Sequence, residues 1–303
     1  MTISDMKLYD FVDPVDAECV RRETEDLMRA LFPDCDATLF RTAFADVEDL
    51  FAGRYPGYRA SNTRYHNFEH TCSVVLASAR LLYGAMVQGE PLTEADCLKG
   101  LLASLFHDVG LIQDVDDTRG TGAKHTVGHE ERSILFMRGY LDNVLSEQDI
   151  EDIADCIRCT ILAMPPSRIA FRTETMRLMG YFTGTADLLA QIADRYYLEK
   201  LLLLFEEFKE ARLPGYDSAF DLVIKTRSFY KDVARPRLDR EFKGVDRHML
   251  AYFRSWRNVD KDLYREAIDR NLAYLDKILA ECNANLDEFV ARLRRSNNQE
   301  PLC

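Results

Sequence analysis

Apolar residues recur at helical spacing along most of this chain, and no run of alternating, β-branched residues bounded by turn signals interrupts the pattern. A strand repeats its side chains with a period of about two and a helix with a period of about 3.6, so the pattern restricts the chain to helices packed on helices. The sequence therefore predicts an all-α fold. The expected helices cover residues 15–32, 36–52, 67–88, 93–107, 128–141, 146–163, 172–181, 184–212, 217–232, 246–256, 260–281 and 285–295.

The chain carries enough apolar material for one large core. It has 303 residues, of which 47% are apolar, and we find neither an internal repeat nor a low-complexity tract. Two breaks rich in glycine or proline, at 110–124 and 163–168, do not resemble interdomain linkers. We therefore expect a single all-α domain over residues 1–303. The segment 110–124, which is rich in glycine and aspartate, is a candidate lid.

The charge balance limits the class of partner. A formal net charge of −12 and a pI near 5.1 disfavour nucleic-acid binding, because such binding depends on lysines and arginines that neutralise phosphates. The N-terminal segment is interrupted by charges, and no stretch approaches ~18 uninterrupted apolar residues. We therefore expect a cytoplasmic protein that binds neither nucleic acid nor a membrane and whose partner is a small molecule.

The cysteines are scattered through a long chain without secretory features, which favours free thiols over a disulfide framework. Cys156 and Cys159 form a CxxC motif, but no second pair lies nearby. We therefore expect these two thiols to pack inside a helix rather than to bind zinc.

Five of the six histidines fall between positions 66 and 129. His66 and His70 are four residues apart near the start of an expected helix, so they share one face of it. His107 and Asp108 close the expected helix 93–107, and neighbouring residues reach one ion most easily where a helix ends. Imidazole and carboxylate together form a ligand set for divalent metals, so this cluster predicts a metal site.

Two further groups could complete such a site. Asp187 lies among leucines and alanines in the stretch "TADLLAQIA", and a carboxylate in apolar surroundings is costly unless it is paired or bound to metal. His125 and His129 form a second pair four residues apart, followed by two glutamates. They could supply a second metal or its water shell.

These residues carry a resemblance to a known family. The strings "YHNFEH" and "LFHDVG", the histidine-led helix "HEERSILFMRGYL" and the aspartate in "TADL" follow one another in the order typical of the HD superfamily of metal-dependent phosphohydrolases. The chain is particularly similar to the catalytic domain of the cyclic nucleotide phosphodiesterases, over about residues 60–212. The resemblance implies an HD-domain, phosphodiesterase-like helical bundle over 60–212, with 1–59 and 213–303 as helical extensions packed on it.

The resemblance also implies roles for single residues. His70, His107, Asp108 and Asp187 would hold the tighter metal, with Asp108 bridging to a second ion and acting in catalysis. His66 would be the general acid. His125, His129 and Thr160 would hold the second ion or its waters. The cofactor would be a pair of divalent ions, for which Zn, Mn, Mg and Fe all suit the ligand set.

The expected activity is hydrolysis of a phosphoester of a nucleotide or another small metabolite, either a phosphodiester or a phosphomonoester, by a metal-activated hydroxide. Tyr65, Lys124 and Gln191 are candidate substrate contacts. The phosphodiesterases read the base with a glutamine near the end of the catalytic domain, whereas the segment 240–260 contains no glutamine. Specificity for cyclic nucleotides is therefore not implied.

Two other functions stay open. Some HD-fold proteins are dinuclear iron oxygenases, which also have two further histidines after the HD pair, and His125 and His129 match that requirement in number. The chain could instead be a noncatalytic regulatory module that binds metal or nucleotide, although such a module has no physical reason to keep several titratable groups in a core. The helical extension 213–303 could pack on the core or form a homodimer.

Overall fold

The computed structural model describes residues 6–282 and 285–293, and the chain is all-α in these ranges. They contain twelve α-helices and no strand, and the extended backbone forms one isolated bridge between Tyr58 and Asp114. The all-α prediction is therefore confirmed. The helices are α1 (Ala17–Leu31), α2 (Thr38–Phe51), α3 (Phe68–Val87), α4 (Glu94–Phe106), α5 (His129–Leu141), α6 (Glu147–Arg158), α7 (Glu174–Ile192), α8 (Tyr197–Glu210), α9 (Ala219–Phe229), α10 (His248–Arg257), α11 (Leu263–Glu281) and α12 (Leu286–Arg292).

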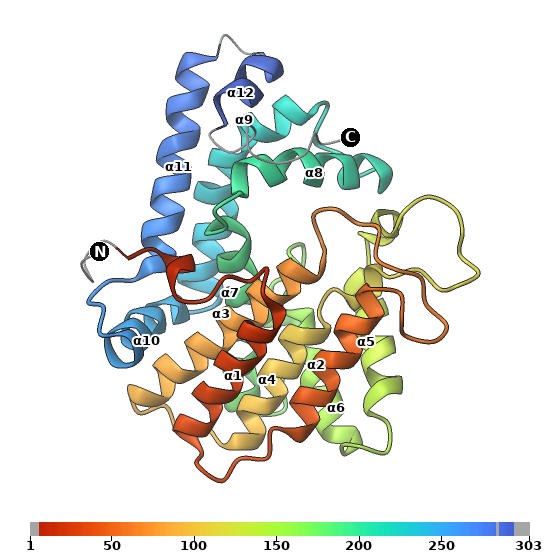
Figure 1. The fold of residues 1–303 in the computed structure, drawn as a ribbon, viewed down its shortest axis with the longest axis vertical. Coiled ribbons are helices and arrows are strands. Elements are labelled where there is room, and N and C mark those ends of the chain that lie inside the picture. Colours follow the sequence, from red (N-terminus) through yellow and green to blue (C-terminus); the bar gives the residue numbers. More distant parts are fainter. Residues whose placement is uncertain (1–5, 283–284, 294–303) are drawn as a thin grey trace.

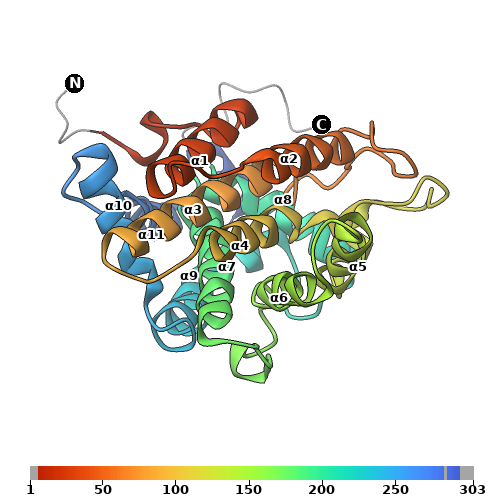
Figure 2. The same cartoon turned by 90° about the horizontal axis from the view of Figure 1, so that it is seen from below.

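Helix α3 lies at the centre of the molecule. It packs against α1, α4, α7 and α10, and nearly all of its side chains are buried. In Figure 1, α1 to α6 fill the lower half of the view, while α8, α9, α11 and α12 fill the upper half. Figures 1 and 2 both place α5 and α6 on the side opposite α10. His70, in the first turn of α3, is buried within this helix assembly.

By length and composition alone, α3 could cross a membrane. It is the only such helix in the described ranges, and 89% of its most apolar window is buried inside the protein. A long apolar helix at the centre of a packed core gives the same signal. Its neighbours on all sides explain why it is apolar all round.

Two boundaries near the site differ from the sequence prediction. The segments predicted as separate helices, 172–181 and 184–212, instead form the continuous helix α7 up to Ile192 and then α8 from Tyr197. Gly184 lies inside α7 and does not end it. Glycine is needed there because the helix approaches a neighbouring segment: a Cβ would lie 2.7 Å from the carbonyl oxygen of Cys159 and would collide with Phe242. The chain breaks later, where the Asp194 carboxylate accepts a hydrogen bond from the Tyr196 amide at 2.7 Å.

The helix predicted over 146–163 ends at Arg158, before the two prolines. The buried guanidinium of Arg237 explains this early end. Its Nη2 donates to the carbonyl oxygens of Cys159, Ile161 and Met164 at 2.9–3.1 Å, and its Nη1 donates to that of Leu162 at 3.2 Å. These carbonyls therefore have a partner without a further helical turn.

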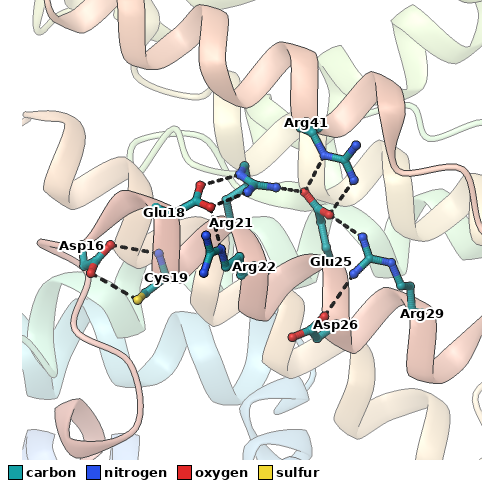
Figure 3. A network of polar contacts seen from close by, with 9 residues as sticks. All are labelled: Asp16, Glu18, Cys19, Arg21, Arg22, Glu25, Asp26, Arg29 and Arg41. Atoms are coloured by element: carbon teal, nitrogen blue, oxygen red, sulfur yellow. Dashed lines mark hydrogen bonds and ion pairs between the residues drawn. The ribbon is translucent and has the colours of Figure 1, made fainter.

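The N-terminal helices α1 and α2 are joined by an ion-pair network around Glu25 (Figure 3). The Glu25 side chain is only 4% exposed and contacts the guanidinium groups of Arg21, Arg29 and Arg41. Arg21 and Arg29 belong to α1 with Glu25, whereas Arg41 reaches it from α2 at 2.8 Å. The network therefore fixes α1 and α2 to each other.

The C-terminal helices pack on the core within the described residues. Helix α10 contacts α3, α11 contacts α7, and α9 packs along α8. Between α9 and α10 the chain continues through two wide helical turns, Tyr230–Ala234 and Arg237–Glu241. Helix α8 and the segments that follow it thereby face the residues predicted to bind metal.

Candidate metal centre

Three helices bring the predicted ligands together. His70 lies in the first turn of α3, where the side chain of the N-cap Asn67 accepts from the His70 amide at 3.1 Å. Helix α4 ends at Phe106, so His107 and Asp108 occupy the turn just beyond it and point to a common site. Asp187 comes from the middle of α7, and α3 packs against both α4 and α7.

The ligand atoms of this cluster lie close to one another. His70 Nε2 is 3.2 Å from Asp187 Oδ1 and 3.6 Å from Asp108 Oδ2, and His107 Nε2 is 3.2 Å from Asp108 Oδ2 and 3.9 Å from Asp187 Oδ1. Two ligands that each lie about 2.1 Å from one ion are about 3.0–3.4 Å apart at octahedral or tetrahedral angles. The group of His70, His107 and Asp187 could therefore hold a metal ion.

The polar atoms that face this cluster also fit a metal. The Nδ1–H of His107 donates to the carbonyl oxygen of Ser104 at 2.9 Å, which leaves Nε2 turned toward the carboxylates. His107 Nε2 and Asp108 Oδ2 are both buried and make no hydrogen bond of normal geometry. Unsatisfied polar atoms in a core are costly, and a divalent ion between them would satisfy both.

The electrostatics show how strongly these groups interact. Burial disfavours the imidazolium form of His107, but the negative charges of Asp108 and Asp187 outweigh it and raise the pKa of His107 to about 9. Burial also disfavours the ionised form of Asp108, yet His107 and His129 hold the pKa of Asp108 well below its usual range. Asp108 is therefore a buried carboxylate that the neighbouring imidazoles stabilise in its ionised form.

His129 lies on the other side of Asp108. Its Nε2 is 3.1 Å from Asp108 Oδ1, and its Nδ1–H donates to the carbonyl oxygen of Thr126 at 2.8 Å. The two oxygens of Asp108 thus face different partners: Oδ2 faces His70 and His107, and Oδ1 faces His129. The two oxygens of this buried carboxylate are therefore in different surroundings.

A glycine permits this contact. Gly110 follows the HD pair, and a Cβ at this position would collide with the carbonyl oxygen of His129 and lie 2.6 Å from the Ser133 amide nitrogen. The Ser133 hydroxyl accepts from the Gly110 amide at 2.8 Å and donates to the carbonyl oxygen of His107 at 2.6 Å. These two hydrogen bonds hold helix α5 against the turn 107–110, which carries Asp108.

His66 points into the same site and is held by a residue that the sequence analysis missed. Its Nδ1–H donates to Glu207 Oε2 at 2.6 Å, and Glu207 Oε1 accepts from the Tyr65 amide at 2.7 Å. Burial disfavours the imidazolium form of His66, but the hydrogen bond to Glu207 and the charge of Asp108 together raise the pKa of His66. One signal was present: Glu207 is a carboxylate within the apolar stripe of α8, as Asp187 is within α7.

A cavity of about 540 Å³ adjoins the candidate metal centre. Of the predicted residues, Tyr65, Thr160 and Gln191 line it together with His66, His70, Asp108, His129 and Asp187. The remaining wall comes mainly from α8, α9 and the turn after α6. The site is therefore a cluster of candidate metal ligands that borders a large chamber.

Two of the predicted residues lie elsewhere. His125 Nε2 is 3.2 Å from Asp117 Oδ2, and Lys124 pairs with the same carboxylate. Neither residue lines the cavity. The segment 110–124, predicted as a lid, begins with buried residues, and the Gln113 side chain donates to the carbonyl oxygens of Asp117 and Arg119, both at 3.1 Å. The conformation of this segment places His125 against Asp117 and not against the candidate metal ligands.

The cysteines take no part in this cluster. Cys156 is buried in α6 and Cys159 follows the end of that helix, and burial raises the pKa of both thiols. The cysteines in the described ranges are free thiols, as predicted, and Cys303 lies outside those ranges.

The fold and the site together define an all-α protein with a buried histidine and aspartate cluster that could hold a metal ion. Compared with models of known protein families and with curated proteins, the chain matches none.

Proposed function

We propose that the chain is a metal-dependent phosphohydrolase with an HD-domain, phosphodiesterase-like core, which cleaves a phosphoester of a small metabolite. One observation carries this proposal. The buried carboxylate of Asp108 presents Oδ2, which lacks a hydrogen-bond partner, to His70 and His107, and presents Oδ1 to His129. A carboxylate with histidines on both sides would suit two divalent ions.

Divalent ions held there would neutralise the oxygens of a bound phosphoester and lower the pKa of a water molecule. The chain supplies their positions. The hydrogen bonds of His107 and His129 to backbone carbonyls fix the direction of each imidazole, so that Nε2 of both rings faces Asp108. Asp187 is 24% exposed and borders the cavity, so it marks the side of the cluster that a substrate reaches.

His66 is placed to donate a proton to the leaving alkoxide. Because Glu207 accepts from Nδ1, the ring presents Nε2 to the cavity. Glu207 also favours the protonated ring, which is the form that can donate. A histidine held in this way is suited to general acid catalysis of phosphoester cleavage.

The test begins with the metal. The protein is purified without added metal, its metal content is measured, and phosphate release is assayed across phosphomonoesters, phosphodiesters and cyclic phosphoesters. We expect Asp108→Ala to lose bound metal and at least 10³-fold in kcat/KM, roughly the loss of a central catalytic group. His125→Ala should keep both, because His125 contacts Asp117. Activity of Asp108→Ala equal to that of the wild type would refute the proposal.

His129 gives an oxygenase some support, since it places a further histidine beside Asp108. The oxygenase hypothesis also requires a second histidine, His125, which lies against Asp117 instead. The same purification separates the two functions. Bound iron with oxygen-dependent turnover and no phosphate release would establish the oxygenase, whereas bound metal without turnover on either assay would indicate a binding module.

A further inference from the structure

The cavity is much larger than a metal centre requires, and the wall away from the metal ligands is apolar. Helix α8 contributes Leu201, Leu204 and Phe208, and the segment from the end of α8 through α9 contributes Leu213, Leu222 and Phe229. Transfer of an apolar group from water into a chamber of about 540 Å³ lined in this way is favourable. It therefore favours an apolar occupant.

Two hydroxyl groups in this wall already donate to backbone carbonyls. The Thr226 hydroxyl donates to the Leu222 carbonyl oxygen at 2.9 Å, and the Thr160 hydroxyl donates to the Ile157 carbonyl oxygen at 2.8 Å. A nucleobase buried against this wall would lose its hydrogen bonds to water, and besides these two hydroxyls the uncharged hydrogen-bonding side chains in the wall are those of Tyr197 and Tyr216. Such losses cost a ligand about 1–3 kcal/mol for each unpaired group.

The cations in the wall are also paired. The two lysine or arginine residues among the described lining residues are Lys225 and Arg237. Lys225 donates to Asp221 at 2.7 Å and to the Gly215 carbonyl oxygen at 2.9 Å. Arg237 pairs with Glu241 at 3.1 Å and binds the carbonyls of the turn after α6. Among the described lining residues, therefore, no lysine or arginine is left unpaired to receive a second or third phosphate.

Apolar side chains also lie where the cavity meets solvent. Val127 and Leu162 both line it, and they are 71% and 43% exposed. They come from different segments, one just before α5 and the other after α6. Exposed apolar residues around a pocket are typical of a site that admits an apolar ligand.

We propose that the chamber formed by α8, α9 and the turn after α6 binds the apolar alcohol part of a phosphoester that carries a single phosphate, such as an alkyl, isoprenyl or aryl phosphate. This inference rests on the proposed function. The phosphate lies at the metal ligands and the apolar part fills the chamber. On cleavage, the oxygen of a water molecule forms the new bond to phosphorus and the P–O bond to the alcohol breaks. The alkoxide takes a proton from His66, one proton of the water stays on the released phosphate, and the other passes to solvent, from which His66 is protonated again.

Binding of n-alkyl phosphonates tests this without turnover, because a phosphonate keeps the tetrahedral anion and lacks a P–O–C bond. Calorimetric titration in the presence of Mn²⁺ should show affinity that rises about threefold to fourfold per methylene, from methyl upward, until the chamber is filled. Chelation should weaken every member of the series and leave the factor per methylene unchanged, since that factor comes from the apolar wall. Adenosine monophosphate should bind no more tightly than methyl phosphonate.

A pair of variants locates the effect. Leu213→Asn places an amide in the chamber wall at a partly exposed position and should flatten the chain-length dependence for the longer phosphonates. Leu135→Asn makes the same change on α5, at a side chain that is 70% exposed and does not line the cavity, and should leave the series unchanged. Circular dichroism of both variants confirms that they are folded.

The outcomes separate the two proposals. A series without chain-length dependence, in a protein that still releases phosphate from other esters, would overturn the apolar chamber and leave the phosphohydrolase intact. A steep series in a protein that cleaves no phosphoester would support the apolar chamber as a binding site and refute hydrolysis. Tighter binding of adenosine monophosphate than of decyl phosphonate would overturn the chamber proposal directly.

Discussion

At the scale of single residues, the carboxylate of Glu207 determines how His66 can act. It accepts from His66 Nδ1 at 2.6 Å and from the Tyr65 amide, and its side chain is 5% exposed. We expect Glu207→Gln to lower turnover about 10–100-fold, because the amide removes the charge that favours the protonated ring. Metal content should stay at the wild-type level, since Glu207 lies outside the ligand cluster.

The measurement compares kcat on esters with good and poor leaving groups. The loss should be largest for poor leaving groups, which depend most on a proton donor. Glu206→Gln is the control, because this neighbour on α8 is exposed and its contact, at 3.9 Å, is with Lys209. An equal loss for all leaving groups would show that Glu207 has only a structural role.

Local spacing explains which site residues the sequence could indicate. His66, His70, His107 and Asp108 were predicted from local spacing. The structure places His66, His70 and Asp108 at one cavity with Asp187, and His107 behind them within the same ligand cluster. Glu207 was missed because its contact with His66 spans 141 residues, a separation that helical periodicity does not encode. His125 has the same spacing to His129 as His66 has to His70, but the turn at Gly128 directs it to Asp117.

At the scale of elements, the packing of the turn 107–110 against α5 depends on Gly110. We expect Gly110→Ala to lower the free energy of unfolding by about 1–3 kcal/mol, because its Cβ would meet backbone atoms of His129 and Ser133 that cannot easily move. Displacement of Asp108 from His129 should also weaken metal binding. Thermal unfolding and a metal titration measure the two effects.

Gly139→Ala is the matched control on α5. Gly139 is exposed, and a Cβ there would meet nothing within 4 Å, so alanine should be neutral or stabilise the helix by about 0.5–1 kcal/mol. If both variants unfolded at the wild-type temperature, close packing at Gly110 would not be what holds α5 beneath Asp108.

The network around Glu25 joins α1 to α2 and should make stability depend on pH. Hydrogen bonds from Arg41 and then Arg29 lower the pKa of Glu25 from 4.5 to about 2, although burial opposes this. A lowered pKa in the folded state adds stability that is complete above pH 4.5 and is lost as the pH falls toward 2. Because the arginines are partly exposed, we expect Glu25→Gln to cost about 1–2 kcal/mol at pH 7.

Denaturant unfolding at a series of pH values checks this. The difference between wild type and Glu25→Gln should be constant from pH 7 to 5 and should shrink from pH 4.5 downward. Asp26→Asn is the control, since its carboxylate is 58% exposed and pairs with Arg29 alone. A difference that does not change with pH would assign the effect of Glu25→Gln to packing and not to charge.

Element boundaries were harder to predict than the elements themselves. Every predicted helix region contains helix in the structure, because amphipathic periodicity is a local property. The ends near the site depend on distant partners: Arg237 binds the carbonyls that end α6, and the approach of Phe242 and Cys159 requires Gly184 inside α7. Neither contact could be read from the residues around the boundary.

At the scale of the whole molecule, the candidate ligands tie three helices of the core to one point. His70 comes from α3, His107 and Asp108 from the end of α4, and Asp187 from α7. An ion that binds the folded chain and not the unfolded chain adds about 2.7 kcal/mol of stability when its concentration is 100 times its Kd. For a chain of 303 residues that corresponds to roughly 4 °C in Tm.

We therefore expect chelation to lower Tm by that amount and metal to restore it in a concentration-dependent manner. Asp187→Ala should remove the response, since it deletes the ligand that α7 contributes. His125→Ala should keep the full response, because His125 is held by Asp117 away from the three helices. The two variants should therefore behave differently in the same thermal-unfolding experiment. If His125→Ala lost the Tm shift and Asp187→Ala kept it, the metal would bind in the loop before α5 and not at the centre of the helix assembly.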